Sequence, residues 1–155
     1  MLWQLRGIDE KRGSDMKFTF TDNSKEVLDA LDAAADRALM ICGGKAERYA
    51  KENIRDNGSV VTGLLRNSIT FARGGQTAGI GSYTADKGGG SGSYSGTAPN
   101  DKGGEKAVYI GTNVEYAPFV ELGTSRSRAK PYLRPAAEGH GEEYKQIIKN
   151  ELSKA

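Results

Sequence analysis

The side chains that most often carry chemistry are few and scattered in this chain of 155 residues. Its one histidine, His140, lies between two glycines, with no second histidine or cysteine at metal-ligand spacing. The one cysteine, Cys42, falls on the apolar face of a predicted helix and can form no internal disulfide. We therefore expect Cys42 to be a small buried residue, and neither side chain predicts a catalytic or metal site.

Two other patterns invite a chemical reading. Glu115 and Glu121 could be paired carboxylates, but they are six positions apart across a proline, which gives no reason to place them together. The glycine-rich segment Asp86–Gly104 lacks the Gly-Lys-Ser/Thr ending of a phosphate-binding loop, and the chain has neither Gly-x-Gly-x-x-Gly nor Gly-x-Ser-x-Gly. The sequence predicts no enzyme and no cofactor.

The most informative stretch follows a short apolar strand around Val108–Ile110. From Tyr116 to Leu122 the apolar residues recur at three- and four-residue spacing, which predicts one or two helical turns, and Gly123 ends them. Pro131 and Pro135 prevent regular pairing on either side of the residues between them. This pattern predicts a rigid corner that presents aromatic and aliphatic anchors.

Glu121 lies inside this predicted corner, and we expect its role to be structural. Its carboxylate would accept hydrogen bonds from the backbone of Gly123–Ser125, or it would pair with Arg66 or Arg134.

The corner is followed by a basic cluster, for which three interpretations stay open. It is a solvated loop, it pairs with acidic residues of an adjoining subunit, or it contacts passing DNA. The formal charge of +2, from 22 basic and 20 acidic side chains, is too balanced for a general nucleic-acid binder. The cluster consists of Arg126, Arg128, Lys130 and Arg134.

The elements that must position this corner begin with a long helix. Asn23 and Glu26 form a capping-box pattern, and apolar residues then recur with helical period as far as Ile54. Gly43-Gly44 predicts a bend, or two helices in line, and Asn57-Gly58 predicts the stop. The apolar stripe is rich in small residues, which indicates close approach to another surface, either its own sheet or a neighbouring subunit.

Strands follow the helix. Ser68–Arg73 and Ala78–Thr84 are predicted as two strands joined by a pair of glycines, and Lys106–Thr112 as a third. Between them lies a glycine-rich loop at 85–105, which we expect to be flexible in the isolated protein. In an assembly it would order against the next subunit, with Tyr94 as its anchor.

The N-terminal residues 1–15 form a polar leader or extension, and alternation from Met16 predicts the first strand. The leader reflects an upstream start or an added extension, or it is an arm used in assembly. Residues 16–155 are expected to form a single domain that ends with a helix over Pro135–Ser153, weakened by Gly139 and Gly141. The predicted fold is α+β, with the long N-terminal helix packed on a small, mainly antiparallel sheet.

Composition sets the remaining limits. The 21 glycines and the hydrophobic share of 37% indicate that part of the chain stays outside the core and gains stability in an assembly. No apolar run approaches the roughly 20 residues that span a bilayer, and the first residues do not form a signal peptide. We expect a soluble protein made in the cytoplasm, with no membrane partner.

Two pieces of the chain also carry a family resemblance. Tyr116-Ala117, Val120–Thr124 and Pro131–Ala136, with Thr62–Ile69 upstream in the same order, resemble the signature of small phage morphogenesis proteins. These are tail components, tail-completion or head–tail joining proteins of long-tailed double-stranded DNA phages and prophages. Leu122 departs from the pattern, because the family more often has an aromatic residue or histidine there.

The resemblance implies a virion structural protein of the phage neck that joins head and tail, or completes the tail, as an oligomeric ring of six copies in keeping with tail symmetry. Its partners would be copies of itself and other neck and tail proteins, such as the connector and tail terminator, with assembly in the host bacterial cytoplasm. The alternative is a small DNA- or RNA-binding protein that uses residues 126–134. The interface candidates are Tyr94, Tyr116, Phe119, Val120, Glu121, Arg126, Arg128, Tyr132, Leu133 and Arg134.

Overall fold

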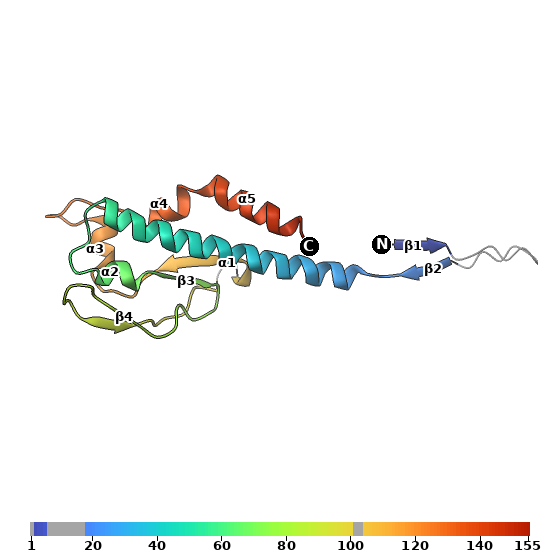
Figure 1. The fold of residues 1–155 in the computed structure, drawn as a ribbon, viewed down its shortest axis with the longest axis horizontal. Coiled ribbons are helices and arrows are strands. Elements are labelled where there is room, and N and C mark those ends of the chain that lie inside the picture. The colour runs from blue at the N-terminus through green and yellow to red at the C-terminus, as the bar shows by residue number, and fades with distance from the viewer. Residues whose placement is uncertain (1, 6–17, 101–103) are drawn as a thin grey trace, which may run out of the picture.

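The structure, a computed structural model, describes residues 2–5, 18–100 and 104–155 and has the predicted α+β class. One long helix runs through the centre, with two short C-terminal helices on one side, the strands of residues 70–111 on the other, and the two N-terminal strands beyond its start (Figure 1). In chain order the elements are β1 (Leu2–Leu5), β2 (Phe18–Thr21), α1 (Ser24–Asp56), α2 (Leu64–Ser68), β3 (Thr70–Arg73), β4 (Ser82–Thr84), β5 (Ser91–Ser93), a 3-10 turn (Gly104–Lys106), β6 (Val108–Gly111), α3 (Ala117–Leu122), α4 (Leu133–Glu138) and α5 (Gly141–Leu152).

The central helix α1 is a single helix that continues through Gly43-Gly44, so two helices in line was the wrong alternative. It starts after Asn23 as predicted, but the Asn23 side chain caps no backbone group. Asp22 Oδ1 instead accepts a hydrogen bond from the Ser24 N–H at 2.9 Å. At the other end Asn57 is the C-cap, and Gly58 follows with a φ of 71°, as the predicted stop requires.

The small-residue stripe of α1 packs within the chain, against the sheet at Gly43 and against α5 at Cys42. A Cβ atom on Gly43 would lie 2.8 Å from both Phe71 Cε2 of β3 and Val108 Cγ2 of β6, closer than carbon atoms can approach. Glycine is therefore needed there to let the helix and sheet meet. The buried positions of the stripe are Ala34, Ala38, Cys42, Gly43, Ala46, Ala50 and Ile54.

Every strand pair in the described residues is antiparallel, as the predicted fold expects, and the pairs form three two-stranded sheets. β3 pairs with β6, from Thr70 opposite Gly111 to Arg73 opposite Val108, and β4 pairs with β5. The two strands predicted on either side of Gly74-Gly75 do not pair with each other, because the chain after Gly75 turns to pair with the segment before Pro99. The Gly75 N–H donates to Ala98 O at 3.1 Å, and the Ala98 N–H donates to Gln76 O at 2.9 Å.

The glycine-rich segment 85–105 contains strand β5, where we expected no strand. Its flexibility in the isolated protein stays a prediction. At the N-terminus, β2 matches the predicted first strand, and the leader contributes β1, which pairs with it. The rest of the leader lies outside the described residues.

The predicted C-terminal helix is two helices, α4 and α5, which separate at Gly139 and His140. The α5 helix packs along α1, with Cys42 Sγ 3.8 Å from Tyr144 O and Arg37 Nε 3.5 Å from Glu151 Oε2. The hydrophobic core lies between α1, the β-strands and α4. It comprises Ala50, Ile54, Leu65, Ile69, Tyr83, Val114, Ala117, Tyr132 and Ala136.

Candidate assembly interface

The predicted corner is formed by α3, the loop 124–131 and the start of α4. Gly123 ends α3 with a φ of 75°, and a Cβ atom there would lie 2.6 Å from Ala129 N. The loop is closed by backbone bonds, since the Lys130 N–H donates to Val120 O at 2.8 Å and the Thr124 N–H donates to Ser127 O at 2.8 Å. Only glycine fits at position 123 without opening this loop.

Glu121 holds the corner through its carboxylate. Oε2 accepts hydrogen bonds from the N–H groups of Tyr132 at 2.7 Å and Leu133 at 3.0 Å, and Oε1 accepts one from Arg134 N–H at 3.0 Å. These donors begin α4 and have no partner within that helix. The expected bonds to the Gly123–Ser125 backbone and the expected pairing with the side chain of Arg66 or Arg134 were therefore wrong. The Arg134 guanidinium pairs with Glu138 at 3.1 Å, and Arg66 pairs with Asp86. Arg134 binds Glu121 through its backbone N–H instead.

Tyr132 and Leu133 face inward from this corner. Tyr132 is fully buried in the core, and its burial raises the pKa of the phenol well above its usual range. Leu133 packs partly buried against the same core. A side chain with no exposed surface cannot touch a partner, so Tyr132 supports the corner from inside and is not a surface anchor.

A set of apolar side chains on and beside α3 is exposed. Tyr116 is 43% exposed, Phe119 61% and Leu122 76%, and Val61 beside them is 83% exposed. A groove of about 410 Å³ runs between these parts, lined by Val61, Leu64, Tyr116 and the half-buried Val120 among others. We call Val61, Tyr116, Phe119 and Leu122 the α3 patch.

Sequence reasoning identified Tyr116 and Phe119 but not Leu122 or Val61. Leu122 follows Phe119 by three positions, so helical spacing could have placed it on the same face. Val61 follows the stop of α1 in a segment without periodicity, and no sequence signal brings it to α3.

The loop of the corner carries three exposed basic side chains, Arg126, Arg128 and Lys130. In the part of the chain that the structure describes, none of the three forms an ion pair, whereas Arg134 is paired with Glu138. Asn57 Nδ2 donates to Lys130 O at 3.2 Å, which fixes the loop to the C-terminal end of α1. We call Arg126, Arg128 and Lys130 the basic loop.

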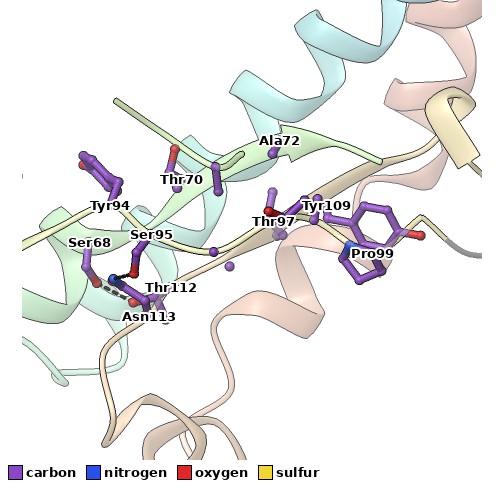
Figure 2. A pocket seen from close by; sticks show the side chains of 15 residues that line it. Ser68, Thr70, Ala72, Tyr94, Ser95, Thr97, Pro99, Tyr109, Thr112 and Asn113 are labelled. Atoms are coloured by element: carbon purple, nitrogen blue, oxygen red, sulfur yellow. Dashed lines mark hydrogen bonds between the residues drawn. The ribbon is translucent and has the colours of Figure 1, made fainter. Parts of the chain in front are cut away.

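Tyr94 lies elsewhere, at a second groove of about 360 Å³ over the outer face of β3 and β6 (Figure 2). Its hydroxyl donates to Asn67 O at 2.9 Å, and its ring lies 5.2 Å from that of Tyr83. Tyr94 thus packs on its own domain. Hydroxyl and amide groups line this groove, among them Asn113, whose Nδ2 donates to Ser95 Oγ at 2.9 Å. The lining includes no carboxylate, amine, thiol or imidazole, and its titratable side chains are the phenols of Tyr94 and Tyr109.

The remaining candidates for chemistry have structural surroundings. His140, expected on an exposed turn, is half-buried and stacks on Tyr49 with ring centroids 3.5 Å apart. Cys42 is buried as predicted, and that burial raises the pKa of its thiol. Among the described residues no three His, Cys, Asp or Glu side chains are grouped so that they could hold a metal ion.

None of the helices in the described ranges is long and apolar enough to cross a membrane. A model of the family described as "Bacteriophage HK97-gp10, putative tail-component" matches residues 18–123, from β2 through the end of α3. Neither the comparison with curated proteins nor that with solved structures gives a significant match. The matched segment covers most of the chain and includes the α3 patch, and it confirms the resemblance seen in the sequence. The chain therefore belongs to the HK97-gp10-like family of bacteriophage tail components.

Proposed function

We propose that this phage tail component acts at the neck, where it joins the head to the tail or completes the tail by forming a ring, six copies in keeping with tail symmetry. The observation that carries the proposal is the α3 patch, in which Phe119 is 61% and Leu122 76% exposed on a corner that Glu121 holds in place. Exposed apolar side chains gathered on one surface are typical of protein–protein contact sites.

The mechanism is assembly by shape, without a reaction. Because the corner is closed by backbone hydrogen bonds, little conformational entropy is lost when it docks. Copies of the chain would contact each other through unlike surfaces, and such contacts close into a ring when the rotation per subunit allows. The finished ring would meet neighbouring neck and tail proteins, such as a connector and a tail terminator.

Electron microscopy of particles tests this function, using the phage or prophage that encodes the chain. We expect a label on the chain to appear at the head–tail junction, and we expect its deletion to leave separate heads and tails. Particles that assemble and infect normally without the chain would contradict the proposal.

A matched pair of variants tests the α3 patch. Phe119→Asp should leave the fold intact and block joining, because it places a charge in an apolar contact. Ile80→Asp is the control, because Ile80 is fully exposed outside the patch. If both variants reduced head–tail joining equally, the α3 patch would not be the contact surface.

The basic loop supports one alternative, a DNA- or RNA-binding protein that uses residues 126–134. Three cations would bind nucleic acid weakly. A plot of the logarithm of the association constant against the logarithm of the salt concentration would have a slope no steeper than about −3. Filter binding at two salt concentrations separates the two functions. Micromolar affinity at physiological salt would favour nucleic-acid binding, whereas we expect no retention there.

A further inference from the structure

The apolar face of α1 extends beyond the layers that cover it. Ala34 and Ala38 have no exposed surface, whereas Val27, Leu28 and Leu31 on the preceding turns are 55%, 61% and 39% exposed. In Figure 1 the first turns of α1 project past the end of α5 and past the strands β3 and β6, toward β1 and β2. We call Val27, Leu28 and Leu31 the N-terminal face of α1.

The same turns are acidic. Asp29 is paired with Lys25 and Asp32 with Lys106, while Asp36 is paired with Arg73 at 2.7 Å and more distantly with Lys106 at 3.8 Å. No cation within the described residues forms an ion pair with the carboxylates of Asp22 or Glu26. Residues 22–36 hold five acidic side chains, Asp22, Glu26, Asp29, Asp32 and Asp36, against one basic side chain, Lys25.

The opposite end of α1 carries the complementary combination. There the exposed α3 patch adjoins the basic loop, which is held to the helix end through Asn57. At 1.5 Å per residue, the 33 residues of α1 separate the two ends by about 50 Å. The two surfaces therefore cannot meet within one chain.

We propose that these two surfaces bind each other in successive copies of the chain. The α3 patch of one copy covers the N-terminal face of α1 of the next, and the basic loop faces Asp22 and Glu26. Apolar burial supplies affinity, and opposite charge sets the register and rejects wrong pairings. A second copy is the occupant because one chain carries both halves of a contact that matches in charge and in apolar character.

The inference rests on the proposed ring, because a contact between unlike surfaces leaves one of each free for the next copy. To the proposed ring, the inference adds the identity of the two surfaces that meet between successive copies. Two experiments on the full chain test it: cross-linking reports which surfaces meet, and sedimentation velocity reports self-association whichever surfaces are used.

Disulfide cross-linking tests which surfaces meet. In a Cys42→Ala background, which removes the buried thiol, Leu28→Cys and Phe119→Cys are made singly and together. After mild oxidation we expect a ladder of oligomers from the double variant and a dimer from an equimolar mixture of the single variants. Leu28→Cys cross-linking to itself as efficiently as in the mixture would overturn the proposal, because like surfaces would then meet.

Charge reversal tests whether the basic loop faces Asp22 and Glu26. The measurement is self-association, followed by sedimentation velocity. Asp22→Lys with Glu26→Lys in one chain, or Arg126→Glu with Arg128→Glu in another, should each weaken self-association at least about tenfold through like-charge contact. Mixing the two chains should restore it, because each then meets an opposite charge at both ends. Glu142→Lys, which reverses an exposed charge on α5, is the control.

The outcomes distinguish this inference from the proposed function. Self-association that persists in both charge variants overturns only the pairing proposed here. A wild-type chain that stays monomeric at every concentration, and that forms no ring in particles, overturns the ring and the pairing together.

Discussion

Glu121 is the residue on which the corner between α3 and α4 depends most directly. Its two oxygens accept three backbone hydrogen bonds from residues 132–134, while its own backbone belongs to α3. One side chain thus joins two helices that are otherwise connected by the ten residues 123–132. A carboxylate is suited to this position because a negative charge at a helix N-terminus is stabilised by the helix dipole.

Glu121→Gln should therefore destabilise the fold by about 1–2 kcal/mol, because the amide lacks the charge and presents an N–H₂ group to one of the donors. Thermal unfolding followed by circular dichroism measures the effect as a lower Tm. Glu115→Gln is the matched control, since Glu115 is exposed and makes no hydrogen bond to another described residue. An unchanged Tm for Glu121→Gln would show that the carboxylate does not hold the corner.

Glu143 predicts a pH dependence of stability. Its carboxylate receives hydrogen bonds from Lys45 and Tyr49, and these hold its pKa below the ordinary 4.5. A lowered pKa means that the folded state favours the charged form, so the stabilisation is complete above pH 4.5 and is lost as the pH falls through the lowered pKa. The urea concentration at the unfolding midpoint should therefore decrease as the pH is lowered below 4.5.

Glu143→Gln tests this directly. We expect the wild type to be more stable than the variant at neutral pH, and the difference to shrink in acid. Glu142→Gln is the control, because the Glu142 side chain is 92% exposed. A difference that is independent of pH would assign the effect of Glu143 to packing instead.

At the scale of elements, α1 contacts the sheet through Gly43 and faces away at Gly44. A Cβ atom on Gly43 would meet Phe71 and Val108, whereas one on Gly44 would have only Phe71 Cε1, at 3.9 Å. Gly43→Ala should destabilise the fold by about 1–3 kcal/mol through overpacking. Gly44→Ala should stabilise it by up to about 1 kcal/mol through helix propensity. Chemical denaturation measures both, and equal effects would contradict the close contact at Gly43.

The elements themselves were largely predictable, but their pairing was not. The helical period of α1 and the stop at Asn57-Gly58 are local signals, and both were confirmed. The pairing of β3 with β6 joins segments almost forty residues apart, and nothing local in Ser68–Arg73 distinguishes that partner from the nearer β4. Gly139 signalled the split between α4 and α5. A glycine can either weaken a helix or end it, however, and the sequence alone does not distinguish the two.

The same limit applies to the candidate interface. Tyr116 and Tyr132 are both aromatic residues of the predicted corner, yet Tyr116 is 43% exposed and Tyr132 is fully buried. Which of the two is buried depends on the contact of α4 with α1, which spacing within the corner does not reveal. For Glu121 the sequence indicated a structural role. The backbone N–H groups that it binds could not be predicted, because they depend on where α4 begins.

At the scale of the whole molecule, the core and the N-terminal strands are separate. Every residue of the core cluster lies between Ala50 and Ala136, while β1 pairs with β2 ahead of α1. We propose that residues 16–155 fold as one domain without the leader. Deletion of residues 1–15 should then change the Tm by no more than a few degrees, because the core cluster consists of residues between Ala50 and Ala136.

The same deletion decides what the leader does, because stability and assembly are measured on one variant. If residues 1–15 are only an extension, the shortened chain keeps both its Tm and its head–tail joining in particles. If they are an arm used in assembly, the Tm stays and joining is lost, because β2 loses the strand that pairs with it beside the N-terminal face of α1. A large fall in Tm would contradict both readings, since it would make the leader part of the folded domain.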